Sequence, residues 1–407
     1  MARIVQKFGG TSVADIERIK VAAEWVKAEV DADHQVAVTV SAMAGVTDEL
    51  VGYVDMVSSL YDAREYDVVV SAGEQVTSGL LALVLQNIGV DARSWLGWQI
   101  PVFTDSAHGK ARISRIKETQ LVECMEKGQV PVIAGFQGVG MDNRVTTLGR
   151  GGTDTSAVAL AAAVNADRCD IYTDVDGIYT TDPRIVPTAQ KLEKITYEEM
   201  LEMASVGAKV LQTRAVEMAM KYNQIVQVRS SFSNKPGTLV VNEEEIVEQE
   251  LVSGIAYSRD EAKITLVKVL DKPGVAAAIF GPLADASINV DMIVQSVSED
   301  GEATNLTFTV ATNDLERTVT TIKSNYKEIG YEKIISDSKV AKVSVVGVGM
   351  RTHAGVAQKM FQTLAEKSIN IQVISTSEIK VSVLIDEEYT ELAVRALHSA
   401  YGLDSGQ

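Results

Sequence analysis

A lysine stands just ahead of two glycines and two hydroxyl residues in the stretch IVQKFGGTSV, residues 4–13. A β-branched run ends at Lys7, and Gly9, Gly10 and Ser12 lead toward a helical pattern. Backbone N–H groups of such a strand-to-helix turn can face an anion, and the lysine adds a positive charge beside them. In a Walker A loop the lysine follows the glycines, so this is a different arrangement. Taken alone, the stretch fits phosphate binding and a tight βα turn equally well.

A second glycine-rich turn, GRGGTDTSAVALAAA (residues 149–163), also opens a helical pattern. Arg150 offers a planar fork that suits a carboxylate. Asp154 falls at the expected helix N-terminus, where it can cap the helix or hold Lys7 in place. Two glycine-rich helix starts in one parallel-sheet domain favour phosphoryl transfer over two packing turns.

Two further stretches carry polar residues at informative places. Glu74, in SAGEQ, lies in an apolar segment, and a buried acid needs a cationic partner, either a structural lysine or the ammonium of an amino-acid substrate. In IYTDVDGIYTTDPR a strand ends at Thr173-Asp174 and continues into a polar loop with Tyr179 and Arg184. Ligands of open α/β sheets bind beyond the carboxyl ends of the strands, so this loop is either a nucleotide site or a long surface turn.

The elements that must position these residues follow an α/β pattern up to about residue 241. Short β-branched runs alternate with helical patterns, which predicts βαβ units on a mostly parallel sheet. Residues 16–30 form an amphipathic helix capped by Asp15, and residues 67–87 form a buried helix. The acidic stretch NEEEIVEQE (242–250) marks the main domain boundary. The predicted strands are Ile4–Phe8, Val36–Val40, Val130–Ala134, Asp170–Thr173 and Ile225–Val228.

The C-terminal part contains an internal repeat. The stretch beginning at Gly274, GVAAAIFGPLADASINVDMIVQ, aligns without a gap with GVAQKMFQTLAEKSINIQVIST, which begins at Gly355. The offset is 355 − 274 = 81 residues. Each copy shows a strand, a glycine-containing loop, a helix and a second strand, so two tandem copies of one small α/β module are predicted.

Composition narrows the classes of function. A chain of 407 residues exceeds one ordinary core, so at least two domains are expected. The net charge of −17 without a basic run argues against nucleic-acid binding. Two distant cysteines encode neither a disulfide framework nor a zinc site. The start of the chain has no leader pattern and no stretch is apolar for about 18 residues, so a cytoplasmic protein without a membrane span is expected.

The motifs together resemble the aspartate kinases of the amino-acid-kinase superfamily, which carry two C-terminal ACT domains. The resemblance rests on KFGGTSV, SAM with Thr47-Asp48-Glu49, SAGE, TTLGRGGTDTSAVALA, YTDVDGIYTTDPR and STSEIKVSVLI. It implies an α/β fold: an amino-acid-kinase domain with a mostly parallel sheet between helices, followed by tandem ferredoxin-like ACT modules. The implied boundaries are 1–245 for the catalytic domain, 246–262 for a linker and first regulatory strand, and 263–337 and 338–407 for the modules.

The resemblance also implies roles for individual residues in the transfer of a phosphoryl group from ATP to L-aspartate. Lys7 would neutralise charge on the transferred group and Asp154 would organise Lys7. Magnesium would arrive with the nucleotide, so no protein metal site is expected. Aspartate would contact Ser41, Thr47, Glu74 and Arg150, with Glu74 on its ammonium and Arg150 on its α-carboxylate. ATP would contact Lys7, Gly9, Gly10, Ser12, Thr173, Asp174, Tyr179, Arg184 and Lys209.

For the ACT modules the resemblance implies feedback by lysine, threonine or both, and pairing of modules between chains in a homo-oligomer. Asp291 and Gln295 correspond to Gln372 and Thr376, so the two copies need not bind the same ligand. The implied effector contacts are Asp271, Asn289, Val290, Asp291 and Gln295 in the first copy, and Gly355, Val356, Asn370 and Ile371 in the second.

Two departures and two alternatives accompany the resemblance. Some members make a separate regulatory chain from an internal start, but no methionine lies between Met220 and Met292, which favours one kind of chain. Leu211-Gln212-Thr213-Arg214 stands where many members have Leu-His-Pro-Arg, so no role is carried over from that histidine. One alternative is a kinase for another small acid on the same fold, although a substrate without a free α-ammonium would not need Glu74. The other is a catalytically silent amino-acid sensor, against which stands the presence of every residue implied for catalysis.

Overall fold

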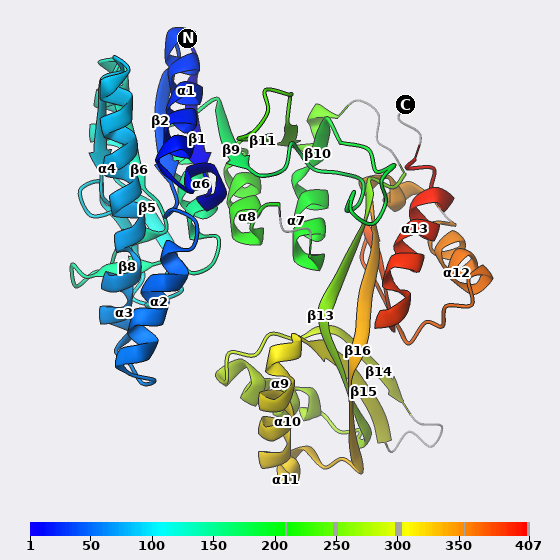
Figure 1. The fold of residues 1–407 in the computed structure, drawn as a ribbon. Coiled ribbons are helices and arrows are strands. Elements are labelled where there is room, and N and C mark those ends of the chain that lie inside the picture. The colour runs from blue at the N-terminus through cyan, green and yellow to red at the C-terminus, as the bar shows by residue number, and fades with distance from the viewer. Residues whose placement is uncertain (208–209, 247–250, 298–302, 354, 405–407) are drawn as a thin grey trace. The chain divides into compact units, whose positions relative to one another are not determined.

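The computed structural model describes the chain except residues 208–209, 247–250, 298–302, 354 and 405–407 (Figure 1). It divides into two compact units. The first holds Met1–Ile178, Lys191–Ala204 and Lys209–Val247, and the second holds Glu248–Gln407 together with Tyr179–Gln190 and a short segment beginning at Ser205.

The first unit is built on an eight-stranded sheet in the order β10-β12-β11-β9-β1-β2-β6-β3. Neighbouring strands are parallel except β11 and β12, which are antiparallel. The five strands predicted from β-branched runs are all present, as β1, β2, β6, β9 and β11. The bounds are β1 Arg3–Phe8, β2 Gln35–Val40, β3 Ala92–Trp95, β6 Val130–Ala134, β9 Arg168–Thr173, β10 Lys194–Thr196, β11 Val226–Ser230 and β12 Thr238–Val241.

Helices cover this sheet, and alternation along β1 decides which side chain meets which helix. Phe8 packs in a core with α1 (Ile16–Asp31) and α4 (Ala72–Asn87). Lys7 points the other way, toward α6 (Gly152–Ala163), because successive strand residues face opposite sides. Asp15 caps α1 as predicted by accepting the N–H of Arg18 at 2.8 Å. Further helices of this unit are α5 Thr119–Glu126, α7 Tyr197–Val206 and α8 Thr213–Tyr222.

The buried helix predicted over residues 67–87 is instead two helices. α3 (Ala63–Val70) ends at Val70, Ser71 interrupts the helix, and α4 begins at Ala72. The outer face is exposed at Val68, Val76 and Leu83, so the segment is not buried all round. Ala63–Asn87 is long and apolar enough to cross a membrane by length and composition alone, but half of its apolar window is buried inside the fold.

A small four-stranded sheet, in the order β5-β4-β7-β8, lies next to α3 in the same unit. It was not predicted, because its strands are only three or four residues long. Their bounds are β4 Val102–Thr104, β5 Ile113–Ile116, β7 Gln137–Val139 and β8 Val145–Thr147, and α2 spans Val46–Val57.

The second unit contains a six-stranded sheet in the order β14-β15-β13-β16-β18-β17, and the 81-residue repeat is visible in it. α9 (Val275–Asp285) and α12 (Val356–Glu366) are equivalent, and each begins after a glycine with positive φ, Gly274 or Gly355. The prediction of two copies of one module is therefore confirmed. The other bounds are β13 Gly254–Leu270, β14 Asp291–Val297, β15 Ala303–Val310, α10 Leu315–Ser324, α11 Tyr326–Ile329, β16 Lys333–Val346, β17 Val373–Thr376, β18 Lys380–Asp386 and α13 Thr390–Ala400.

The segment Tyr179–Gln190 joins the core of the second module. Ile185 and Val186 pack with residues of β16, β18, α12 and α13. Thr180 hydrogen-bonds the buried His398 at 2.8 Å, and the backbone N–H of Ile255 donates to the carbonyl of Thr180 at 2.7 Å. A stretch that follows the β9 strand of the first unit is thus structurally part of the second.

Candidate active site

Lys7 and Asp154, 147 positions apart in sequence, form an ion pair in the first unit. Lys7 Nζ lies 2.6 Å from Asp154 Oδ1, and each side chain is only 10% exposed. Lys7 is near the carboxyl end of β1, and Asp154 is in the first turn of α6. The carboxylate is favoured there by the positive end of the helix, and it holds the ammonium at the end of the sheet where ligands bind.

The first glycine-rich turn leaves room for a ligand because it lacks side chains. A Cβ on Gly9 would lie 3.1 Å from Lys7 Nζ, and one on Gly10 would lie 3.3 Å from the carbonyl oxygen of Ala42. The short helix that follows, Gly10–Val13, continues directly from this turn. The backbone N–H of Gly9 donates to the carbonyl of Tyr172, and those of Ser12 and Val13 donate to the carbonyl of Gly9. The group at this turn that suits a phosphate is therefore the Lys7 ammonium, and the glycines keep side chains out of its way.

Glu74 is buried beside this turn with half of its carboxylate unused. Its side chain is on the first turn of α4, and Oε1 accepts the backbone N–H of Ala42 at 3.0 Å. The other oxygen, Oε2, is buried and has no hydrogen-bond partner among the described residues. Burial raises the pKa of Glu74 to about 7, against the smaller opposing effect of the Ala42 hydrogen bond. Such an acid suits a cationic group that the described residues do not supply.

A missing side chain explains how Glu74 comes so close to Ala42. A Cβ on Gly73 would lie 2.6 Å from the Cβ of Ala42, which is too close for any other residue. Ser41, just before Ala42, donates its N–H to the carbonyl of Phe8 at 3.0 Å, and its side chain is partly exposed. Thr47 is also partly exposed, in the first turn of α2. The structure thus connects the turns after β1 and β2 with the start of α4.

The turn that carries Arg150 lies between two glycines with positive φ, Gly149 at 79° and Gly151 at 66°. Both glycines adopt a backbone conformation that L residues rarely take. Arg150 itself is exposed, whereas the α6 residues that follow are buried. The guanidinium is therefore presented at the surface of the first unit, at the start of the helix that holds Asp154.

The side chain of Ser12 points into the fold, whereas a phosphate-binding role predicts that it faces a ligand. Its side chain is fully buried, and its hydroxyl lies 2.9 Å from the hydroxyl of Ser231 and 3.3 Å from the carbonyl of Tyr172. Its N–H donates to the carbonyl of Gly9 at 2.8 Å. The serine therefore fixes the turn internally, because both of its donors are already used within the fold.

The residues expected around the nucleotide are distributed over both units. Thr173 ends the β9 strand, which is adjacent to β1, and Asp174 follows it; the Thr173 hydroxyl lies 3.2 Å from Asp174 Oδ1. Tyr179 and Arg184 belong to the second unit. There Tyr179 packs against the module core, and the exposed Arg184 pairs with Asp182 at 2.8 Å. Lys209 lies outside the described residues.

Known proteins share both parts of this architecture. The amino acid kinase family matches residues 2–230, and ACT domains match residues 263–325 and 343–401. The aspartate kinase of Pseudomonas fluorescens is 56% identical, with 100% of this chain and 98% of that protein covered. The aspartokinase of Corynebacterium glutamicum is 47% identical, with 99% and 97% covered. This chain belongs to the aspartate kinase family.

Solved structures of family members have the same fold. Escherichia coli aspartokinase III in complex with aspartate and ADP superimposes with a TM-score of 0.83 at 28% identity, covering 98% of this chain and 99% of that one. The same enzyme in complex with lysine and aspartate gives a TM-score of 0.77 at 28% identity, covering 97% and 98%. The predicted fold, a kinase domain followed by tandem ACT modules, is confirmed.

The expected effector residues of this family member all lie in the second unit. Asp291 pairs with the buried Lys342, whose ammonium lies 2.7 Å from Asp291 and 2.7 Å from Glu261. This pair joins the two modules, and a second contact joins them in the reverse sense: Lys263 in the first module donates to Gln372, the equivalent of Asp291 in the second. Val356 is buried in the module core, so its side chain is not presented to a ligand. Of the rest, Asp271, Asn289, Gln295, Gly355 and Asn370 are exposed, and Val290 and Ile371 are partly buried.

Two features of this chain were missed by sequence reasoning, a buried carboxylate at Asp67 and the bridging guanidinium of Arg214. Asp67 accepts hydrogen bonds from His108, Gly109 and Thr147. Arg214 donates to the carbonyls of Leu148 and Ala111. The only sequence signals were a charged residue in an apolar segment and an arginine at a helix start. Among the described residues, no three His, Cys, Asp or Glu side chains gather closely enough to hold a metal ion.

Proposed function

We propose that this chain transfers the γ-phosphoryl group of ATP to the side-chain carboxylate of L-aspartate, giving 4-phospho-L-aspartate and ADP. The observation that carries the proposal is the buried, half-unpaired carboxylate of Glu74 close to the glycine turn of Lys7. A site for a phosphate group thus adjoins a site for an ammonium group. The relatives named aspartate kinase, and the E. coli enzyme in complex with aspartate and ADP, support the same pair of substrates.

Charge stabilisation accounts for most of the catalysis in this proposal. Phosphoryl transfer leaves little covalent work to the protein, so positioning and electrostatics dominate. The ammonium of Lys7 neutralises charge that develops on the transferred group, and Asp154 keeps that ammonium in place at 2.6 Å. Gly9 and Gly10 allow the phosphates to approach the backbone. Mg²⁺ bound to the nucleotide supplies further neutralisation of the phosphates.

Aspartate is held by both of its charged ends. Its ammonium binds the free oxygen of Glu74, and its α-carboxylate binds the guanidinium of Arg150. The hydroxyls of Ser41 and Thr47 complete the site. This arrangement leaves the side-chain carboxylate of aspartate as the phosphoryl acceptor near Lys7. The nucleotide lies beyond the ends of β1 and β9, with Thr173 and Asp174 as its contacts in the first unit.

The second unit regulates this activity in response to an end-product amino acid. The catalytic domain extends over residues 1–245, and the ACT modules over 263–337 and 338–407. Lysine, threonine or both bind near Asp291 and its counterpart in the second module. The complex of the E. coli enzyme with lysine supports an amino-acid effector. The reaction is the first step toward lysine, threonine and methionine, in a cytoplasmic homo-oligomer paired through its modules.

Steady-state ADP release tests the proposal. The purified full-length chain is assayed with ATP, Mg²⁺ and one of aspartate, glutamate or N-acetylglutamate, and again with lysine and threonine added singly and together. Turnover with aspartate that one of these additions suppresses is the expected result. Turnover with N-acetylglutamate alone would identify a kinase for another acid, and amino-acid binding without ADP release would identify a silent sensor.

A further inference from the structure

The turn that presents Arg150 has no side chain of its own to hold it in place. Gly149 and Gly151 flank the arginine at positive φ, and glycine is the residue that leaves the backbone most freedom. Arg150 is exposed, while Leu148 before the turn is buried. The direction of the Arg150 guanidinium therefore depends on what contacts the backbone of this turn from outside.

Arg214 holds the residue that precedes the turn. Its side chain extends from the first turn of α8, where Nη1 donates to the carbonyl of Leu148 at 2.6 Å and Nη2 donates to the carbonyl of Ala111 at 2.9 Å. The guanidinium thus joins two backbone segments, and Ala111 also donates its N–H to the carbonyl of Thr147 at 2.9 Å. The side chain of Gln212 lies against the turn as well, because a Cβ on Gly151 would meet its Cγ at 1.7 Å.

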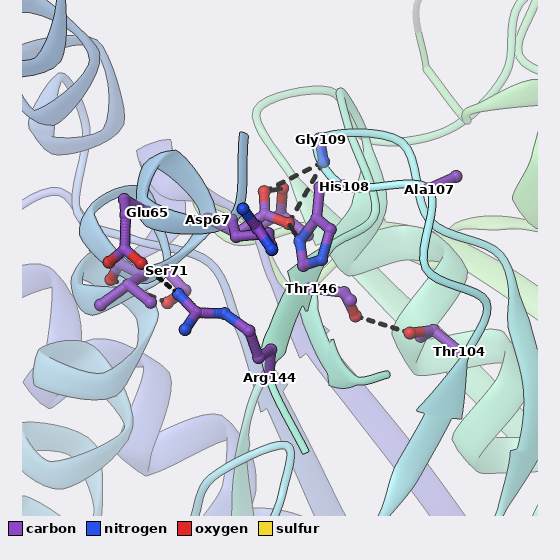
Figure 2. A network of polar contacts seen from close by, with 12 residues as sticks. Glu65, Asp67, Ser71, Thr104, Ala107, His108, Gly109, Arg144 and Thr146 are labelled. Atoms are coloured by element: carbon purple, nitrogen blue, oxygen red, sulfur yellow. Dashed lines mark hydrogen bonds and ion pairs between the residues drawn. The ribbon is translucent and has the colours of Figure 1, made fainter. Parts of the chain in front are cut away.

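Asp67 also supports this turn, through the loop before Ala111. Figure 2 shows its carboxylate facing His108 and Gly109, with distances of 2.7 Å to His108 Nδ1 and 3.0 Å to the Gly109 N–H. The hydroxyl of Thr147 donates to the same carboxylate, which is fully buried. Gly109 in turn touches the Arg150 turn, since a Cβ on Gly149 would lie 3.1 Å from the Gly109 carbonyl oxygen.

We propose that Arg214 is a positioning residue for Arg150, and that Arg214 and the Asp67 network together fix the direction in which Arg150 meets the substrate carboxylate. The proposal rests on the role of Arg150 given above. Two donors in a rigid fork hold two carbonyls at a set separation, which a lysine ammonium on a flexible stem does not reproduce. A small displacement of a substrate-binding group reduces activity strongly, so these two hydrogen bonds of Arg214 determine how well aspartate is held.

The experiment compares Arg214→Lys with wild type in the full-length chain, by the KM for aspartate, the KM for ATP and kcat. We expect the KM for aspartate to rise roughly 10-fold or more, with the KM for ATP changed less than about 2-fold. Arg3→Lys is the matched control, because Arg3 also donates to a backbone carbonyl, that of Val164, at the opposite end of β1. It should leave both KM values unchanged.

A double-mutant cycle with Arg150→Ala separates positioning from a general structural effect. If Arg214 acts through Arg150, Arg214→Lys has almost no further effect on the KM for aspartate once Arg150 is alanine. The proposal is overturned if the two substitutions raise the KM for aspartate by independent factors, so that the double variant shows their product. It is also overturned if Arg214→Lys changes the KM for aspartate and the KM for ATP equally. A normal KM for aspartate in Arg150→Ala alone would instead refute the role given to Arg150. If Arg214→Lys loses its native circular dichroism, Asp67→Asn is measured in the same cycle and judged by the same criteria.

Discussion

Replacing Glu74 by glutamine tests the central feature of the site, a buried carboxylate that awaits a cation. Glutamine has nearly the same shape and keeps an oxygen to accept the N–H of Ala42. It removes only the charge. The variant should therefore fold normally and bind aspartate poorly, because the substrate ammonium loses its anionic partner.

Although Glu74→Gln should weaken aspartate binding, it should make the ligand-free chain more stable than wild type. Burial raises the pKa of Glu74 from an ordinary value of 4.5 to about 7. At 1.36 kcal/mol per pKa unit, ionising this group costs the folded state up to about 3 kcal/mol relative to the unfolded chain. Since the folded pKa is raised, wild type keeps its full stability below about pH 4.5 and loses this amount as the pH rises through about 7. The glutamine variant has no such loss.

Urea unfolding followed by tryptophan fluorescence measures this difference between pH 5 and pH 8. Trp25, Trp95 and Trp98 all lie in the first unit, so the signal reports the part of the chain that contains Glu74. The stability of Glu74→Gln relative to wild type should rise with pH by up to roughly 3 kcal/mol. Titration calorimetry in buffers of different ionisation enthalpy should detect roughly half a proton released on aspartate binding at pH 7. A stability difference independent of pH, with no proton release, would refute the reasoning.

Three further outcomes are expected. Lys7→Ala should lower kcat by roughly 10²–10³ with little change in the KM for aspartate, and the exposed Lys20→Ala serves as its control; an unchanged kcat would remove Lys7 from catalysis. Lys342→Met leaves the carboxylate of Glu261 buried without its ion-pair partner and should destabilise the second unit by about 3–5 kcal/mol in calorimetry, which the added change Glu261→Gln should largely recover. Light scattering with and without lysine should give the mass of two or more chains, and the mass of a single chain under both conditions would contradict pairing of the modules.

Local patterns predicted those elements whose fold follows from near neighbours in sequence. The strands at Ile4–Phe8 and Val36–Val40 and the helix capped by Asp15 were correct because burial in a parallel sheet and the helical period leave clear signatures. The 81-residue repeat predicted two modules because each copy repeats its own glycine start, at Gly274 and Gly355. These features depend on short stretches of sequence alone.

Features that depend on distant contacts could not be obtained in this way. The break at Ser71 divides an apolar stretch that has continuous helical character, and α3 packs beside the small sheet, which sequence reasoning did not predict. The inward position of Ser12 results from Ser231, 219 residues away. The hydrogen bond from Ala42 to Glu74 Oε1 forms where Gly73 lets α4 approach Ala42, and a sequence does not show which residue a glycine will meet.

The segment Tyr179–Gln190 is a covalent link between the two units, because the chain leaves the first unit to form it and then returns. Chain connectivity places it five residues after Asp174, at the end of the strand next to Lys7, yet its side chains are part of the second module. His398 is fully buried between the hydroxyl of Thr180 at 2.8 Å and the carboxylate of Asp404 at 2.9 Å, and Asp404 also accepts from Thr188 at 2.6 Å. A rearrangement of the second module must therefore either carry this segment with it or break these buried hydrogen bonds. Because leaving buried polar groups unpaired is costly, the first course is favoured, and the loop that continues from β9 follows the state of the module.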